Sequence, residues 1–227
     1  MSAQFNIRRA QSRQVSILQH ELDLPRFVAE TLVGRGIDSP RKARAFLYPS
    51  FKHDWENPYD LPGLSEVADA LEAAVRAGKR ILVLGDLDLD GISATTVLTR
   101  GLRDIGADAV PFIPKRFEEG YGITAAALER VKTYCPDFLV TVDCGIACKV
   151  EAKLVQQAGI DVAITDHHEP TDLVPEGVPV ADPKIDPDCP SCVLAGAGVA
   201  LKLVQLLGGR FGKPYLWRDF IDFATLG

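Results

Sequence analysis

Short apolar runs alternate with amphipathic segments through the middle of this 227-residue chain. The run RILVLGD lacks apolar–polar alternation, which is typical of a strand buried on both faces of a sheet, and DAVPFIP, DFLVTVD and IDVAITD also indicate strands. The segments between them, residues 92–107, 124–134 and 149–159, have apolar side chains at helical spacing. Strands and helices alternating in this order form a parallel sheet covered by helices. We therefore predict an α/β domain with a parallel sheet and helices on both faces.

The regions on either side of this pattern are predicted to be helical. Residues 64–79 indicate an amphipathic helix, with Ser65 as its cap and Gly78 as its end. Two further helices are predicted within residues 194–209 and 215–227. We expect a helical N-terminal segment, residues 1–78, that packs on the core, followed by the sheet domain, residues 79–227.

Composition narrows the class of protein. No apolar run approaches the length that spans a bilayer, and the N-terminus lacks the apolar stretch of a secretory signal, so we expect a cytoplasmic protein with no membrane partner. The five cysteines are expected to be free thiols, because a single CxxC is weak evidence for zinc. The net charge of −6 argues against a broad electrostatic grip on nucleic acid, but not against a local groove where metal ions supply positive charge. The chain stops inside an apolar segment, FATLG, so we expect that the native protein continues past it.

Acidic residues follow three of the predicted strands. The run ILVLGD leads into GDLDLDG, FLVTVD ends in an aspartate, and VAITD continues into two histidines; the residues are Asp86, Asp88, Asp90, Asp143, Asp166, His167 and His168. The carboxyl ends of parallel strands form one edge, where ligands bind. Helix capping explains one aspartate per strand, but not three in five residues. We expect Asp86, Asp88 and Asp90 to share one side of an extended segment, with the leucines between them packed behind.

Three familiar sites explain GDLDLDG poorly. An EF-hand needs a bidentate Glu at position 12 of its loop, where this chain has Val97. The glycine motifs of nucleotide-binding loops are absent. The DLDG resembles the start of haloacid-dehalogenase-like phosphatases, with Asp88 as nucleophile, but Ile92 replaces their Thr and the Asp–His–His would have no role. A two-metal centre accounts for all the acids, and mixed oxygen and nitrogen ligands suit Mn²⁺, with Mg²⁺ as a substitute.

Five motifs in order resemble the RecJ branch of the DHH phosphoesterase superfamily. They are GDLDLDG, RFEEGYG, VDCG, DHH and LAGAGVALKL, and the N-terminal LVGRGIDSPRKARAFLYP and the closing IDFATLG fit the same branch. The resemblance implies a metal-dependent exonuclease that digests single-stranded DNA from the 5′ end, releases 5′-mononucleotides and serves DNA repair and recombination. It also implies that single-stranded DNA, and other repair proteins, are the partners.

The resemblance also implies roles for individual residues. Two Mn²⁺ ions would be held by Asp88, Asp90, Asp143, His167 and Asp222, with Asp143 bridging. Asp86 would be a supporting acid or a further ligand, and His168 would contact the scissile phosphate or assist the leaving group. The substrate would lie near Arg116, Gly120, Tyr121 and Gly122, with backbone N–H groups of Gly196 and Gly198 on a phosphate.

Several alternatives stay open at this point. Arg116 could form an ordinary surface ion pair, His168 could be a core histidine, and Tyr121 could stack a base or simply pack. The two glycines of AGAG could serve helix packing instead of phosphate binding. The chain also departs from the family pattern: Leu84 stands where some members have His, and Asp182 where Asn is common.

Two other functions compete with the exonuclease. The first is a DHH phosphodiesterase acting on cyclic dinucleotides or very short RNAs, against which the N-terminal segment argues. The second is a non-catalytic relative serving as a replication scaffold. Such a scaffold would be expected to lose its metal-ligand acids, and this chain keeps them.

Overall fold

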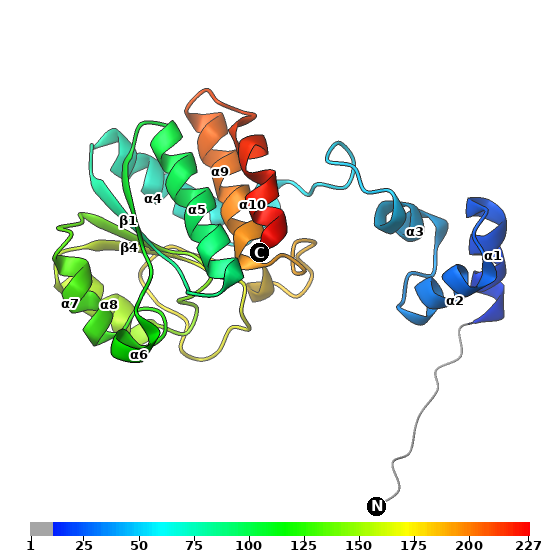
Figure 1. Cartoon of the computed structure of the whole chain (residues 1–227), viewed down its shortest axis with the longest axis horizontal. Helices are drawn as coiled ribbons and strands as arrows, with labels where there is room; N and C mark the ends of the chain where they lie inside the picture. The colour runs from blue at the N-terminus through cyan, green and yellow to red at the C-terminus, as the bar shows by residue number, and fades with distance from the viewer. Residues whose placement is uncertain (1–10) are drawn as a thin grey trace, which may run out of the picture. The chain divides into compact units, whose positions relative to one another are not determined.

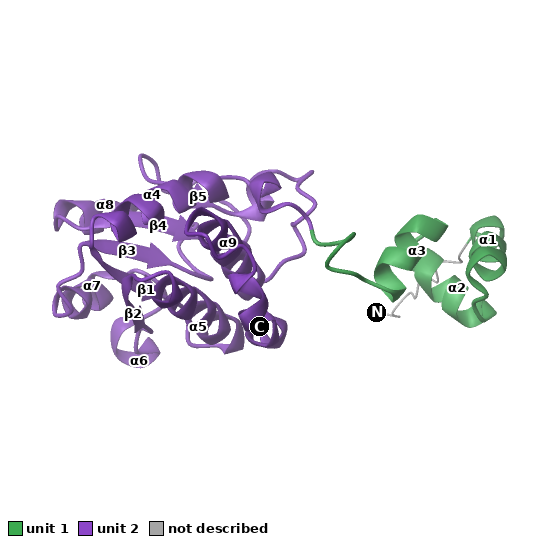
Figure 2. Ribbon diagram, turned by 90° about the horizontal axis from the view of Figure 1, so that it is seen from above, with its two compact units in different colours: residues 1–55 green, residues 56–227 purple. Residues whose placement is uncertain are grey.

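The computed structural model describes residues 11–227 and divides into two compact units, residues up to 55 and residues 56–227 (Figure 2). The first ten residues of the predicted N-terminal segment lie outside the described residues. Helix α4 (Leu64–Arg76), predicted as part of that segment, belongs to the second unit. The packing of the N-terminal segment on the core stays a prediction. No helix within residues 11–227 is both long and apolar enough to cross a membrane.

Within residues 11–55, the first unit is a small group of three helices, α1 (Ser12–Leu22), α2 (Arg26–Gly34) and α3 (Pro40–Leu47). Their facing sides bury a core of Val15, Leu18, Ala29, Leu32 and Ala43. Helix α3 begins with a side-chain cap: the Ser39 hydroxyl accepts the backbone N–H of Lys42, and Pro40 occupies the first helical position.

The second unit contains a five-stranded parallel sheet in the order β2-β1-β3-β4-β5. Strands β1 and β4 of this sheet are labelled in Figure 1. The strands are β1 (Arg80–Leu84), β2 (Asp108–Phe112), β3 (Phe138–Thr141), β4 (Asp161–Thr165) and β5 (Val180–Ala181). The predicted fold class is confirmed. Only β5 was not expected, because a two-residue strand leaves no periodic pattern in the sequence.

Helices cover both faces of the sheet. Helices α7 (Ala125–Lys132) and α8 (Lys149–Gln157) pack on one face, where Leu82, Leu84 and Leu139 meet Leu128 and Val155. The opposite face is covered by α4, α5 (Leu89–Asp104) and α9 (Gly196–Arg210), with α10 (Ile221–Leu226) beside α5 and α9. Short helices complete the unit: η1 (Pro58–Asp60), α6 (Arg116–Glu119), η2 (Pro183–Ile185) and η3 (Leu216–Phe220).

The start of α4 corrects one expectation. Ser65 does not cap the helix, which begins one residue earlier and has Gly63 as its N-cap with a φ of +73°. A side chain at Gly63 would place its Cβ 1.8 Å from the carbonyl oxygen of Val180, so only glycine permits this approach to β5. The five cysteines form no disulfide with one another.

Candidate metal centre

Four aspartates lie side by side at the carboxyl edge of the sheet. The strand register aligns Leu84, Thr141, Ile164 and Val180 in one row across β1, β3, β4 and β5. Two residues beyond each member of this row stands an aspartate: Asp86, Asp143, Asp166 and Asp182, with exposures of 7%, 2%, 1% and 0%. Ligands bind at this edge of parallel α/β sheets. The sheet therefore gathers four buried carboxyl groups from strands far apart in the sequence.

The GDLDLDG motif bends instead of staying extended. Strand β1 ends at Leu84 and α5 begins at Leu89, so Asp88 becomes the N-cap of α5 and its Oδ1 accepts the backbone N–H of Gly91 at 2.9 Å. Leu89 is 59% exposed and does not pack behind the acids. The expected arrangement of three aspartates on one side of an extended segment is wrong, because the chain turns into a helix between them.

Asp90 lies in the first turn of α5 and caps a different helix. Its carboxylate accepts the backbone N–H groups of Gly196 and Ala197, each at 2.7 Å, at the start of α9. Its Oδ2 also lies 3.3 Å from Nε2 of His167. The N–H of Gly196, which the resemblance assigned to a phosphate, is thus already engaged by a carboxylate.

Asp143 occupies the centre of the site in an unusual backbone conformation. Its φ of +60° lies in the left-handed region, which aspartate tolerates better than most residues. Its Oδ1 is 3.0 Å from Nε2 of His167. Burial raises the pKa of Asp143 to about 6; the His167 ring opposes the rise and Asp90 adds to it. The Asp143 carboxylate in turn raises the pKa of His167.

Two groups of side chains at this edge could each hold a metal ion. One consists of Asp86, Asp88 and Asp143, and the other of Asp143, His167 and His168; within each group the ligand atoms lie within 4.8 Å of one another. Asp143 belongs to both groups, which is the position that a bridging ligand needs. Neither group includes Asp90 or Asp222, and Asp222 is exposed in the first turn of α10.

Asp166 organises the histidines. Its Oδ1 accepts the backbone N–H groups of His167 and His168, at 2.7 and 3.3 Å, and lies 2.7 Å from Nδ1 of the His168 ring. Its Oδ2 accepts the N–H of Ile146 at 2.9 Å. Because Nδ1 of His168 is engaged, the other ring nitrogen is left for a metal or substrate. The sequence placed Asp166 at the site but gave it no role.

The RFEEGYG loop borders the same edge. The hydroxyl of Tyr121 donates to the backbone carbonyl of Asp143 at 3.4 Å. Gly120 and Gly122 have φ values of +85° and +67°, so both glycines shape the turn that carries Tyr121. Arg116 is exposed and forms no ion pair with any residue from 11 to 227, so the surface ion pair considered for it is not formed there.

The two glycines of AGAG differ in their surroundings. A Cβ on Gly196 would lie 2.6 Å from the Cβ of Asp143 and 2.8 Å from its Oδ1, so glycine lets α9 approach the centre. A Cβ on Gly198 would meet Leu194 at 3.0 Å, which is a tight packing contact. In this structure the absence of a side chain at both glycines therefore lets α9 pack closely, against Asp143 at Gly196 and against Leu194 at Gly198.

The donor set fits a pair of divalent cations. Oδ1 of Asp143 is buried and, within the described residues, accepts no hydrogen bond of good alignment, which leaves a carboxylate oxygen facing the two groups. Carboxylate oxygens together with imidazole nitrogens suit Mn²⁺, and carboxylates suit Mg²⁺. A cation would also offset the repulsion among buried carboxylates that helps to raise the pKa of Asp143.

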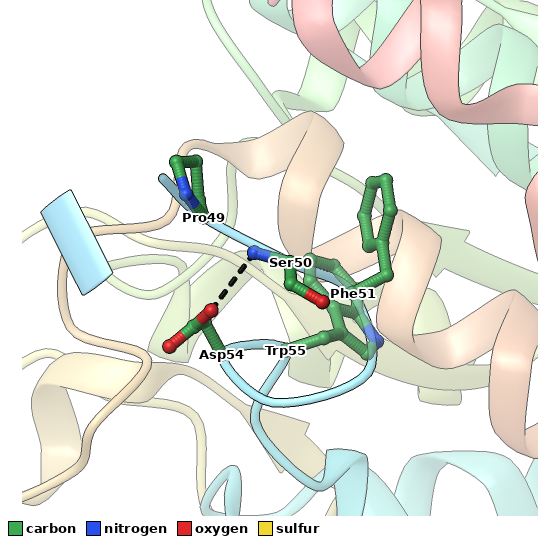
Figure 3. A pocket seen from close by; sticks show the side chains of 5 residues that line it. All are labelled: Pro49, Ser50, Phe51, Asp54 and Trp55. Atoms are coloured by element: carbon green, nitrogen blue, oxygen red, sulfur yellow. Dashed lines mark hydrogen bonds between the residues drawn. The ribbon is translucent and has the colours of Figure 1, made fainter. Parts of the chain in front are cut away.

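A separate hollow of about 180 Å³ lies in the first unit, lined by Pro49, Ser50, Phe51, Asp54 and Trp55 (Figure 3). The Asp54 carboxylate accepts the backbone N–H of Ser50 at 2.8 Å, and the Phe51 and Trp55 rings meet edge to face. Among the described residues that line this hollow, Asp54 is the only one with an ionisable side chain, whereas the sheet edge gathers several carboxylates and two imidazoles.

A parallel α/β domain with a carboxylate and imidazole centre at its carboxyl edge is a fold class suited to metal-dependent phosphoester chemistry. The chain belongs to the DHH family: the model of the DHH family, N-terminal domain, matches residues 80–227. The resemblance inferred from the five motifs is thereby confirmed.

Individual relatives agree with the family match. The chain is 36% identical over 225 residues to the single-stranded-DNA-specific exonuclease RecJ of Bacillus subtilis, covering 98% of this chain and 28% of that protein. It is 42% identical over 195 residues to RecJ of Thermus thermophilus, covering 83% of this chain and 28% of that protein. The chain thus spans less than a third of the length of these relatives.

Solved structures are similar as well. The crystal structure of RecJ in complex with Mn²⁺ from Thermus thermophilus matches with a TM-score of 0.72 and 33% identity, over 94% of this chain and 30% of that one. The crystal structure of exonuclease RecJ bound to manganese matches with a TM-score of 0.63 and 43% identity, over 72% of this chain and 42% of that one.

Proposed function

We propose that this chain is the catalytic part of a metal-dependent 5′-to-3′ exonuclease for single-stranded DNA, which releases 5′-mononucleotides in DNA repair and recombination. The observation that carries the proposal is the pair of metal-binding groups that share Asp143. The relatives named RecJ support the substrate, and two solved RecJ structures with bound manganese support the metal. We propose the cytoplasm as its location, with single-stranded DNA and other repair proteins as partners.

The ligands that we propose follow the two groups. Asp86, Asp88 and Asp143 would hold one Mn²⁺, and Asp143, His167 and His168 the other. Asp90, proposed from the resemblance, would act beside His167, 3.3 Å away, while it also holds α9. Asp222 remains a proposed ligand from the resemblance alone.

When bound, two such ions lower the pKa of a water molecule and stabilise the leaving oxygen of an in-line displacement at phosphorus. The chain itself supplies orientation. Asp166 holds the His168 ring through Nδ1, which leaves Nε2 either as the ligand of the second ion or, in the role that the resemblance implies, for a phosphate oxygen or the leaving group. Exposed Arg116 supplies a cation for the substrate next to an otherwise acidic centre.

Hydrolysis of end-labelled DNA tests the proposal. The purified chain with Mn²⁺ is expected to release labelled mononucleotide first from a 5′-labelled single strand, later from a 3′-labelled strand, and not from a duplex. The matched variant is Asp143→Asn, because asparagine tolerates the left-handed conformation of this position but removes the charge.

Four results would contradict the proposal. Release from the 3′ end would reverse the polarity, and equal activity of Asp143→Asn would remove the metal centre from the mechanism. Faster cleavage of a cyclic dinucleotide or a very short RNA than of a long DNA strand would favour the small-substrate phosphodiesterase. Binding of Mn²⁺ without hydrolysis of any of these substrates would favour a scaffold.

A further inference from the structure

The loop between β2 and α7 is held firmly at its base. The Arg130 guanidinium, on α7, binds both oxygens of Glu119, with Nε–Oε1 at 2.5 Å and an Nη2–Oε2 distance of 2.7 Å. Arg130 also donates to the carbonyl oxygen of Ile113 and lies 3.9 Å above the Phe112 ring. Bidentate pairs of this kind fix geometry as well as charge. The ion pair therefore ties α6 to the strand before it and the helix after it.

The other end of the loop is tied to the metal centre. The Thr124 hydroxyl donates to the carbonyl oxygen of Glu119 and accepts the N–H of Ala127, so the loop ends in a capped helix. Between these anchors, the hydroxyl of Tyr121 donates to the carbonyl oxygen of Asp143. Hydrogen bonds thus hold the loop at both of its ends and, through Tyr121, beside the centre.

Phe117 is an aromatic side chain that this loop leaves in solvent. It is 104% exposed, although it stands on a short helix whose base is rigid. A single exposed apolar residue is ordinary on a protein surface. The residues next to Phe117 suggest a binding role for it. The charged side chains beside it form ion pairs with one another or with α7, with one exception.

The exception is Arg116, the residue before it. Lys115 pairs with Glu118 at 3.0 Å and Glu119 pairs with Arg130, whereas Arg116 forms no ion pair within residues 11–227. An exposed aromatic ring next to an unpaired guanidinium is the combination that grips single-stranded nucleic acid, by base stacking and by phosphate contact. Phe117 is four residues before Tyr121, at most about 14 Å along the chain from a residue that touches the centre.

We propose that Phe117 is a base-stacking residue for the single strand that is cut at the metal centre, with Arg116 on a neighbouring phosphate. The ligand is an unpaired nucleobase of any sequence, because every base offers a face to an aromatic ring. The Glu119–Arg130 pair positions the ring. This inference rests on the proposed function and adds to it the residue that holds the substrate base.

The test combines the loss of the Phe117 ring with the loss of one base from the strand, in the manner of a double-mutant cycle. Wild type, Phe117→Ala and Phe117→Trp are compared on single strands of equal length, intact or with one abasic nucleotide at each successive position, with Mn²⁺. For the intact strand, Phe117→Ala is expected to raise KM about 5- to 150-fold, with a smaller effect on kcat. At one position the abasic strand should be equally poor for wild type and Phe117→Ala. Phe117→Trp should restore the wild-type KM on the intact strand.

Tyr215 provides the matched control. It is an exposed aromatic residue of the same unit, 66% exposed, and follows the C-terminal end of α9. That helix rises about 1.5 Å per residue, so Tyr215 lies at the end of α9 opposite Gly196 and the centre. Tyr215→Ala is expected to leave KM unchanged, and thermal unfolding verifies that each variant is folded.

The outcomes separate this inference from the proposed function. If the wild-type protein neither binds nor cleaves any single strand, the proposed function fails and the inference fails with it. If wild type cleaves and Phe117→Ala has the same KM, only the base-stacking role is overturned. If Phe117→Ala weakens intact and abasic strands alike at every position, the ring acts on the strand without stacking on a base, and the inference is likewise overturned.

Discussion

Asp90 and Gly196 are separated by 106 residues, yet the carboxylate of the first accepts the backbone N–H of the second at 2.7 Å. A second bond joins the same carboxylate to the N–H of Ala197. Through these two bonds Asp90, in the first turn of α5, holds the start of α9. The first residue of α9, Gly196, lies against Asp143. The acidic motif therefore has a structural role as well as its proposed metal role.

This relationship predicts that Asp90→Ala destabilises the metal-free protein. Loss of a carboxylate that caps a helix costs about 1 to 2 kcal/mol, because the two N–H groups lose their acceptor. Asp90→Asn keeps one acceptor oxygen and should lose less. Urea unfolding of the three proteins without metal measures the difference, and an Asp90→Ala protein as stable as wild type would show that water replaces the cap at no cost.

Metal binding itself is expected to depend on Asp143. Wild type should gain thermal stability as Mn²⁺ is added, since a ligand that binds only the folded state stabilises it. Asp143→Asn should show little or no gain, because it removes the carboxylate that both groups share. Asp143→Ala should lose the gain too, and should be less stable than Asp143→Asn without metal because alanine tolerates a φ of +60° poorly. An Mn²⁺-dependent rise of equal size in Asp143→Asn and wild type would contradict this.

The alternating pattern and the strand-end acids of the sequence were sufficient to predict the sheet and the edge that carries the site. Apolar runs such as residues 81–84 are buried on both faces, so their composition alone identifies them. The bend of GDLDLDG was not predictable from periodicity, since the helix begins within the motif at Leu89. Whether an aspartate caps its own helix, as Asp88 does, or a distant one, as Asp90 does, is decided by tertiary contacts.

Asp182, at the β5 side of the sheet, is a second residue whose place could not be predicted from the sequence. The sequence marked it only as an added negative charge, because the two-residue strand before it has no periodic signal. The structure places it in the row of four aspartates and buries it completely. Its Oδ1 accepts the N–H of Lys184 at 2.8 Å, while its Oδ2 is buried without a hydrogen bond within the described residues.

Burial gives Asp182 a predicted effect on stability. It raises the pKa of Asp182 to about 6, above the value of about 3.9 in an unfolded chain. The folded state therefore binds more protons between these values, so stability is full below about pH 4 and falls as the pH rises through about 6. Asp182→Asn should be more stable than wild type at pH 7.5, by on the order of 1 to 3 kcal/mol, and equal to it near pH 4.

A matched control for this change lies four residues further on. Asp186 makes the same local bond, accepting the N–H of Asp188 at 3.0 Å, but it is exposed. Asp186→Asn should leave stability unchanged at both pH values. Urea unfolding at pH 4 and pH 7.5 measures all three proteins, and a gain for Asp182→Asn of equal size at both pH values would mean that charge burial is not its cause.

The last prediction concerns Asp166, the residue that orients His168. Its carboxylate accepts bonds from the backbone of His167, His168 and Ile146 and lies 2.7 Å from Nδ1 of the His168 ring. In Asp166→Asn, the amide NH₂ would face one of these donors, so one bond would be lost and the ring would be held less firmly. Loss of such a partner typically costs 10- to 100-fold in activity or metal affinity.

The control for this change is Asp161→Asn. Asp161 is the exposed first residue of β4, the strand that leads to Asp166, and its replacement should keep wild-type activity. Steady-state hydrolysis of a single strand over a range of Mn²⁺ concentrations measures both quantities, and an Asp166→Asn protein with unchanged kcat and unchanged Mn²⁺ requirement would show that His168 needs no orienting partner.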